Sequence, residues 1–252
     1  MANARSVHIG VLSPATPDRP HFKSLDNILP EGVSIAHEGL GLLGESYQEL
    51  AGKTERVVEL AKSFVQRHDV RGLMVTGGFV TLFNPGLESR VAEAIGLPVV
   101  SAVSSAIAAL SIFAARSVLL MTPFDAASDA VIKTHLDGLG FSVSLGPAFE
   151  NRKAGSPLNL SRDELFDLVE KTFRGNPRTD ALYFQGATMD PLPIIQRLED
   201  ALAVPVITSN TAMLWNLLSK LGLKYSVKGY GKLLTQWPAT AQVMTLPITG
   251  GT

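Results

Sequence analysis

Short apolar runs and longer amphipathic stretches alternate along almost the whole chain. The runs have the length of buried strands, whereas stretches such as 49–66 carry apolar residues at helical spacing. This alternation predicts parallel sheets with helices on both faces. The expected strands are 7–12, 33–36, 73–75, 99–101, 118–121, 141–145, 181–184 and 206–208. The expected helices are 49–66, 87–95, 104–115, 128–139, 192–202, 211–221 and one that runs from a capping box at 161–164 to about residue 173.

Two segments, 94–110 and 201–217, follow the same plan. Each ends a helix, crosses a proline, forms a strand and opens a helix with hydroxyl or amide residues, and the preceding strands end in TGGF and QGAT. A helix–proline–strand step is also common in α/β proteins, so the similarity of the two segments has a simpler explanation than duplication. Because both the step and the turn recur, we predict an α/β fold with two pseudo-symmetric three-layer halves, each with a mainly parallel sheet, and an active-site crevice between them. The halves are expected at 1–108 with 222–252, and at 109–221.

Composition narrows the class of protein. The 252 residues are 46% hydrophobic and 18% charged, which is enough apolar surface to build a core. The formal net charge of −1 offers no electrostatic attraction to nucleic acid or to an anionic membrane. No apolar run is long enough to span a bilayer and no secretory signal is recognisable, so the cytoplasm is the expected compartment. Homo-oligomerisation is compatible with the sequence.

The chain contains no cysteine, which excludes disulfides, thiolate metal sites and thiol catalysis. No set of His, Asp and Glu has metal-site spacing, and neither a Gly-x-Gly-x-x-Gly nor a Walker motif is present. We therefore expect neither a metal nor an organic cofactor.

Six short motifs carry a resemblance to a known family through their order and spacing. They are GLGL (39–42), GGFVTLFNPG (77–86), MTPFD (121–125), SRDELFDLVEKTF (161–173), VPVITSNTAMLW (204–215) and GYGKLL (229–234). Together they resemble the aspartate/glutamate racemase superfamily, specifically its arylmalonate decarboxylase and maleate cis–trans isomerase branch. The resemblance implies two pseudo-symmetric halves, with a small carboxylate bound between them and chemistry at the carbon next to a carboxylate.

The same resemblance locates the reactive positions of the family. Racemases use two cysteines as acid and base, maleate isomerases use one of two as a nucleophile, and arylmalonate decarboxylases keep only the second. Here the first position falls on Gly78, and the second on Gly186, or on Gln185 if the loop is aligned one residue differently. The side chains of the decarboxylase carboxylate pocket are replaced by Phe79, Val80 and Phe124. The resemblance then leaves an anion to be held by the main-chain N–H groups of Phe79, Val80, Gly186 and Ala187.

Proton transfer therefore needs other groups. The candidate acids and bases are His37 and Glu38 at a strand end, and Tyr230 between two glycines. Neighbouring strand residues point to opposite faces, so only one of His37 and Glu38 can face the crevice while the strand continues. The alternative to an acid–base role is that His37 and Glu38 form a solvated strand end and that Tyr230 only packs against its neighbours. Asp125 and Asp190 are further candidates, and helix capping would explain both.

The other residues that we expect to contact substrate follow or precede strand ends. They are Thr76, Ser104, Gln185, Ala187, Ser209 and Asn210, of which the hydroxyl and amide residues at helix starts could equally act as caps. The leading expectation is a cofactor-independent enzyme acting beside a carboxylate of a small (di)carboxylic acid, with decarboxylation favoured. The alternatives are a cis–trans isomerase, racemase or addition/elimination enzyme on a small dicarboxylate, and a non-catalytic carboxylate-binding relative.

Overall fold

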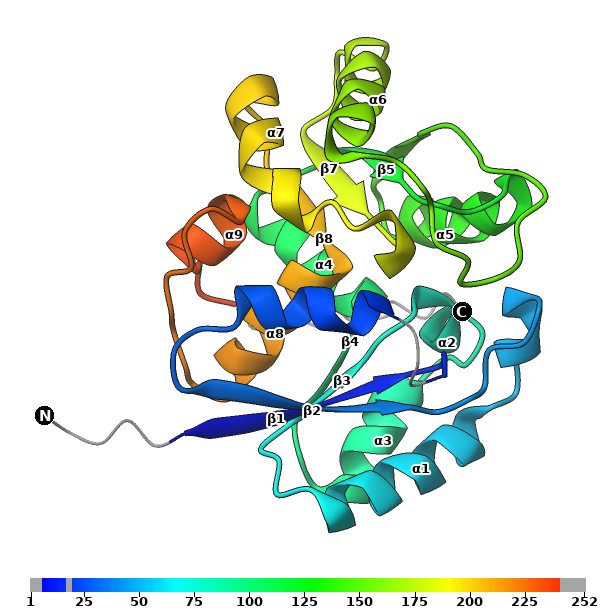
Figure 1. The fold of residues 1–252 in the computed structure, drawn as a ribbon, viewed down its shortest axis with the longest axis vertical. Helices are drawn as coiled ribbons and strands as arrows, with labels where there is room; N and C mark the ends of the chain where they lie inside the picture. Colours follow the sequence, from blue (N-terminus) through cyan, green and yellow to red (C-terminus); the bar gives the residue numbers. More distant parts are fainter. Residues whose placement is uncertain (1–5, 17–19, 241–252) are drawn as a thin grey trace, which may run out of the picture.

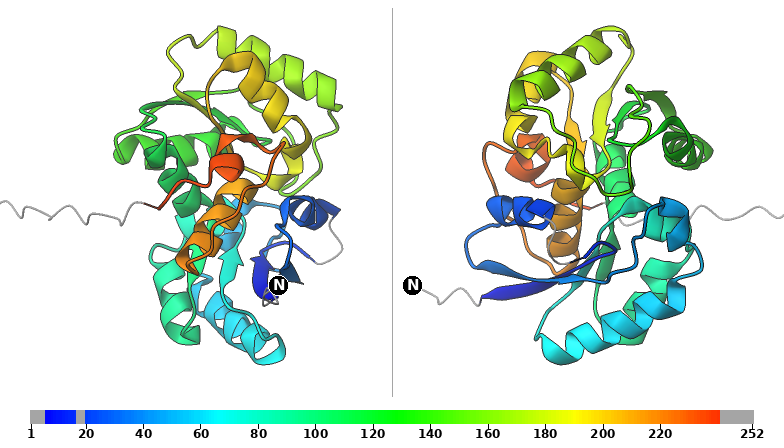
Figure 2. Two further views of the ribbon diagram at one scale, coloured as in Figure 1. Left: turned by 90° about the vertical axis from the view of Figure 1, so that its left-hand side faces the viewer. Right: turned by 45° about the vertical axis from the view of Figure 1, so that its right-hand side comes forward.

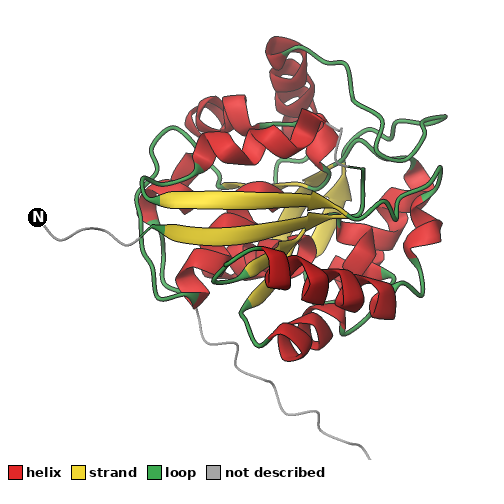
Figure 3. Ribbon diagram, turned by 60° about the horizontal axis from the view of Figure 1, so that its bottom comes forward, coloured by secondary structure: helices red, strands yellow, loops and turns green. Residues whose placement is uncertain are grey.

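The computed structural model describes residues 6–16 and 20–240. It contains two four-stranded sheets whose strand orders are β2-β1-β3-β4 and β6-β5-β7-β8, with all the strand pairs parallel (Figure 1). Helices lie on both sides of the strands (Figure 3). The prediction of an α/β fold with two similar halves and parallel sheets is therefore confirmed.

The first half has short strands bounded by turns and helices. Its strands are β1 (Val7–Ser13), β2 (Val33–Gly39), β3 (Leu73–Val75) and β4 (Val99–Ser101). Its helices are η1 (Pro20–Ile28), η2 (Tyr47–Leu50), α1 (Thr54–Arg67), α2 (Gly78–Leu82), α3 (Leu87–Ile95) and α4 (Ala102–Ile112). The expected helix at 49–66 is interrupted because Gly52, at φ 69°, turns the chain between η2 and α1. The short helices η1 and α2 were not predicted.

The second half repeats this arrangement. Its strands are β5 (Ser117–Met121), β6 (Ser142–Leu145), β7 (Ala181–Phe184) and β8 (Val206–Thr208). Its helices are α5 (Ala126–Gly138), α6 (Arg162–Arg174), η3 (Ala187–Met189), η4 (Leu192–Ile194), α7 (Ile195–Leu202) and α8 (Ser209–Lys220), and α9 (Gly231–Gln236) follows. The predicted capping box is present, since the Ser161 side chain accepts from the Glu164 amide and the Glu164 side chain accepts from the Ser161 amide.

The two equivalent helices α4 and α8 join the halves. They pack against each other, and each also reaches the sheet of the other half, since α4 contacts β8 while α8 contacts β3 and β4. Figure 2 shows α8 (orange) between the two ends of the molecule. Both helices begin with a capping box of hydroxyl residues, Ser101 with Ser104 and Thr208 with Thr211. These caps start the helices two residues before the predicted positions.

The segment that contains α9 is held by a buried carboxylate. Glu199 on α7 is only 3% exposed, and it accepts hydrogen bonds from the amides of Val206 (2.9 Å) and Lys232 (2.6 Å). Burial raises the pKa of this carboxyl group. The helix α9 also contacts α7, α8 and β8 directly. The division of the chain into 1–108 with 222–252 and 109–221 remains a prediction.

The described parts of the chain contain no helix that combines the length and the apolar character needed to cross a membrane.

Candidate active site

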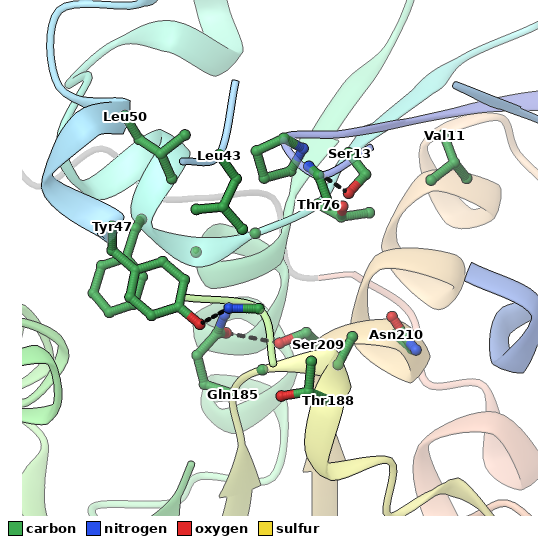
Figure 4. Close-up of a pocket in the computed structure, with 18 of the residues that line it drawn as sticks. Val11, Ser13, Leu43, Tyr47, Leu50, Thr76, Gln185, Thr188, Ser209 and Asn210 are labelled. Atoms are coloured by element: carbon green, nitrogen blue, oxygen red, sulfur yellow. Dashed lines mark hydrogen bonds between the residues drawn. The ribbon is translucent and has the colours of Figure 1, made fainter. Parts of the chain in front are cut away.

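A cavity of about 90 Å³ lies between the two halves, at the carboxyl ends of the central strands (Figure 4). Ligands of open parallel sheets bind at this edge. Its lining is mostly apolar, and no described Lys, Arg, Asp or Glu belongs to it. It is lined by Val11, Ser13, Pro14, Ala15, Leu25, His37, Leu43, Tyr47, Leu50, Thr76, Gly77, Gly78, Phe79, Phe124, Gly155, Gln185, Gly186, Ala187, Thr188, Ser209, Asn210 and Met213.

The sheet registers show which residues of the two halves are equivalent. At the carboxyl end of each sheet, the last pairs between three neighbouring strands are Leu12–Val75–Ser101 and Met121–Phe184–Thr208. Gly77 follows Val75 by two residues, and Gly186 follows Phe184 by two residues, so Gly77 and Gly186 are equivalent. The equivalent of Gly78 is therefore Ala187, so the pseudo-twofold does not relate Gly78 to Gly186.

The two equivalent glycines adopt conformations that side chains rarely tolerate. Gly77 has φ 79° and Gly186 has φ 113°. Each also packs on a proline from the neighbouring strand end: a β-carbon would lie 2.8 Å from Pro14 Cγ at Gly77, and 2.6 Å from Pro123 Cδ at Gly186. Glycine at both positions thus follows from the backbone turn and from close packing.

Six main-chain amides at these turns have no described hydrogen-bond acceptor. They come in equivalent triplets, and all six residues line the cavity: Gly77, Gly78 and Phe79, and Gly186, Ala187 and Thr188. The next amide in each turn is satisfied, because Val80 N donates to Gly77 O (3.0 Å) and Met189 N donates to Gly186 O (3.3 Å). The expected donor at Val80 is therefore not available, whereas Gly77, Gly78 and Thr188 are added to the expected set.

His37 and Glu38 lie on opposite faces of β2, because the strand continues to Gly39. His37 lines the cavity, and its Nε2 lies 2.9 Å from Asp26 Oδ1 on η1. Glu38 instead forms an ion pair with Arg67 at 2.7 Å and does not line the cavity. The partner of His37 is thus Asp26 and not its neighbour in sequence.

An aromatic wall closes one side of the cavity. The ring of Tyr47 lies 4.5 Å from that of Phe79 and 5.0 Å from that of Phe124, and Phe79 also stacks on Phe83 at 5.5 Å. The Tyr47 hydroxyl accepts a hydrogen bond from Gly155 N (3.0 Å), which belongs to a loop of the second half. Our sequence reasoning missed Tyr47, although the SYQE capping box that contains it is a recognisable signal.

Gln185 and Asn210 bring side-chain amides to the cavity. Gln185 is 2% exposed, and its Oε1 accepts from Ser209 Oγ (2.7 Å) and from the Tyr183 hydroxyl. Burial raises the pKa of Tyr183, which keeps its hydroxyl protonated and able to donate. Asn210 Nδ2 donates to Ser24 Oγ (3.3 Å) on η1 and so joins the two halves. Asn210 lies on the side of the cavity away from Tyr47 (Figure 4).

Three other expected site residues do not line the cavity. Val80 is 1% exposed and buried in the core. Ser104 is the third residue of α4, where it caps the helix with Ser101 and donates to Glu88. Tyr230 is half-buried at the start of α9. Of the two further acids, Asp125 caps α5 by accepting from Ser128 N (2.7 Å), and Asp190 follows η3 at a small neighbouring pocket.

A family model described as arylmalonate decarboxylase matches residues 10–234. The chain belongs to the arylmalonate decarboxylase family. This family includes the maleate isomerases and lies within the Asp/Glu racemase superfamily. The present member has no cysteine.

Solved structures share the fold of this arylmalonate decarboxylase family member. An unliganded arylmalonate decarboxylase superposes with a TM-score of 0.77 at 22% identity, covering 91% of this chain and 99% of the other. A mutant maleate cis–trans isomerase from Nocardia farcinica, with a covalently bound succinylcysteine intermediate, gives 0.79 at 21% identity, covering 91% and 98%. The maleate isomerase Iso from Pseudomonas putida S16 gives 0.74 at 18% identity, covering 92% and 99%. No curated protein matches the chain.

A buried aspartate supports the turn that carries Phe124. Asp129 is 3% exposed and accepts a hydrogen bond from Thr122, whose Oγ1 in turn accepts from Phe124 N (3.1 Å). Burial raises the pKa of Asp129 from 3.8 to about 6, and the neighbouring Asp125 and Glu150 add to the increase. The folded state therefore holds this proton over a pH range in which the unfolded chain has lost it.

We expect this family member to lose stability as the pH rises from about 4 to about 6. Over that range the unfolded state binds fewer protons at Asp129, which lowers the free energy of unfolding by about 3 kcal/mol. Asp129→Asn keeps an acceptor for Thr122, so it should remove this part of the pH dependence and be about 2–3 kcal/mol more stable at pH 7. Urea unfolding at pH 4 and pH 7 measures both effects. The control is Asp167→Asn on the exposed face of α6; an unchanged pH slope in Asp129→Asn would contradict the assignment.

Proposed function

We propose that this family member is a cofactor-independent enzyme that acts at the carbon next to a carboxylate of a small (di)carboxylic acid, with decarboxylation as its favoured reaction. One observation carries the proposal: two equivalent triplets of main-chain amides line a single cavity. Fixed N–H groups of this kind bind a carboxylate and stabilise the negative charge that develops on its oxygens in an enolate-like transition state.

The rest of the cavity favours loss of a carboxylate. Tyr47, Phe79 and Phe124 form an apolar wall, and no described Lys or Arg belongs to the lining to stabilise a second carboxylate by charge. A carboxylate held against such a wall is poorly solvated, whereas CO₂ is neutral and suits an apolar surface. When the C–C bond breaks, its electron pair stays on the substrate carbon and is delocalised into the carboxylate that the amides hold.

The resulting carbanion must take up a proton. Of the five groups considered for acid–base work from the sequence, only His37 lines this cavity, and Asp26 orients its ring. We assign His37 in its protonated form as the donor to the carbanion, with water restoring the proton afterwards. Glu38, Asp125, Asp190 and Tyr230 have no such position.

Isomerisation, racemisation or addition/elimination on a dicarboxylate is the second candidate. The support is the shared fold with maleate isomerases, one of which carries a succinylcysteine intermediate. A chain without cysteine cannot form such a thioether, so this route would need a different nucleophile or base. A non-catalytic carboxylate-binding relative is the third candidate, since the amides alone suffice for binding.

A substrate trial in D₂O separates these candidates. We expect a substituted malonate, such as phenylmalonate, to release CO₂ and to gain one deuterium at the carbon that carried it. Maleate is assayed for fumarate, and aspartate and glutamate for deuterium exchange and racemisation. Binding without turnover would support the non-catalytic relative, and failure to bind any of these acids would refute the proposal.

The same activity should be insensitive to thiol reagents, because the chain contains no cysteine to alkylate. Turnover is measured before and after treatment with iodoacetamide. A loss of activity would reveal a contaminating cysteine-dependent enzyme, so the treatment also serves as a purity control for the substrate trial.

A further inference from the structure

A side chain at residue 78 would collide with Gln185. Unlike Gly77, Gly78 has an ordinary helical backbone, so its φ does not require glycine. A β-carbon at residue 78 would lie 2.6 Å from Gln185 Nε2 and 3.0 Å from its Cδ, with Val103 Cγ2 also at 3.0 Å. The carboxamide of Gln185, which follows β7 in the second half, thus fills the space beside the first turn.

Two hydroxyl donors fix the orientation of this carboxamide. Tyr183 and Ser209 both donate to Oε1, which leaves the NH₂ group on the side that faces Gly78. Figure 4 shows the bond between Gln185 and Ser209. No described residue accepts a hydrogen bond from Nε2, although Gln185 is 2% exposed and lines the cavity. The Nε2 atom is not among the described polar atoms that are fully buried without a partner, so it is accessible from the cavity.

The two halves differ at this position. The equivalent of Gln185 in the first half is Thr76, which also lines the cavity but is too short to place an amide across it. The Gln185 carboxamide therefore stands beside the first turn, where the amides of Gly77, Gly78 and Phe79 line the cavity. A carboxylate held at this turn can receive a side-chain N–H in addition to the main-chain amides.

We propose that Gln185 is a positioning residue whose Nε2–H group donates to a carboxylate oxygen of the ligand, in the space that a side chain at residue 78 would otherwise fill. This inference rests on the proposed function and adds to it the side on which the retained carboxylate is held. A carboxamide has no proton to transfer near neutral pH, so Gln185 orients the substrate and leaves proton transfer to another group.

Two substitutions separate the loss of a donor from the gain of a charge. Gln185→Met keeps the length and removes the N–H group, and should weaken malonate binding by about 10- to 100-fold, as expected for a hydrogen bond to a charged group. Gln185→Glu keeps both hydroxyl bonds but brings a carboxylate toward the anion, so its loss should be larger still. Titration calorimetry with malonate measures affinity, and thermal melting shows that both variants fold. Gln66→Met on the exposed face of α1 is the matched control.

The order of the two effects distinguishes positioning from a structural role. If Gln185 only supported the fold, both variants would lose affinity in proportion to their loss in melting temperature. If the wild-type protein binds malonate and both variants bind it equally well, the inference is overturned while the proposed function stands. If the wild-type protein binds none of phenylmalonate, malonate and maleate, the proposed function fails, and the donor role of Gln185 falls with it.

A stability cycle tests the placement without any ligand. Gly78→Ala should lower the urea midpoint in the natural background because the new methyl group meets Gln185, and should lower it much less when combined with Gln185→Ala. The contact between the new methyl group and Val103 remains in both backgrounds. It sets the loss of stability that persists when Gln185 is also replaced. Strictly additive losses would show that the Gln185 carboxamide does not fill the space beside residue 78, and would overturn the inference.

Discussion

Replacing His37 with glutamine should lower the rate of CO₂ release by about 10²- to 10⁴-fold, the range expected when a positioned general acid is removed. Malonate affinity should change little, because the proposed carboxylate donors are the turn amides and Gln185. The deuterium label at the product carbon should lose any stereochemical preference, since bulk water would then supply the proton. Initial rates and product configuration measure these effects.

Glu38→Gln is the matched control, because the neighbouring side chain points away from the cavity and pairs with Arg67. Its turnover should stay within a few-fold of the natural protein. The turnover of Asp26→Asn should lie between those of His37→Gln and Glu38→Gln. This substitution leaves the imidazole in place but removes the carboxylate that lies 2.9 Å from it. Equal activity of His37→Gln and Glu38→Gln would show that another group donates the proton.

A cysteine at residue 186 should destabilise the protein strongly, whereas a cysteine at residue 187 should be tolerated. Gly186 has φ 113° and ψ 110°, and a β-carbon there would lie 2.6 Å from Pro123 Cδ and 2.8 Å from Phe124 Cζ. Backbone strain and overpacking together should lower the free energy of unfolding of Gly186→Cys by about 3–5 kcal/mol. Ala187 is half-buried, lines the cavity and already carries a β-carbon, so Ala187→Cys adds one sulfur atom at the equivalent of Gly78.

Urea unfolding of the two variants measures the difference, with Ala187→Ser as the control for the change in size. Alkylation of Ala187→Cys by iodoacetamide should be slowed by malonate, because the ligand covers the thiol. If Gly186→Cys is as stable as Ala187→Cys, the turn at residue 186 is more adaptable than its conformation indicates. If malonate leaves alkylation unchanged, the ligand does not bind between the two turns.

The local pattern of apolar and polar residues was sufficient to predict the strands and the presence of two similar halves. The bounds of four strands, β3, β4, β7 and β8, match the predicted ranges, because each is a short apolar run between turn residues and both of its faces are buried. The same pattern located the glycine turns and, through the family motifs, the cavity edge on which Gly78 and Gly186 lie. The chain composition alone established that no thiol can act.

Pairs that are distant in sequence could be found only in the folded molecule. His37 with Asp26, Tyr47 with Gly155, and Gln185 beside Gly78 are such pairs. Hydrophobic periodicity reports which face of an element is buried, but not which element of the other half lies against that face. The equivalence of Gly78 with Ala187 likewise needed the registers of both sheets, because a one-residue ambiguity in a turn leaves the apolar pattern of its strand unchanged.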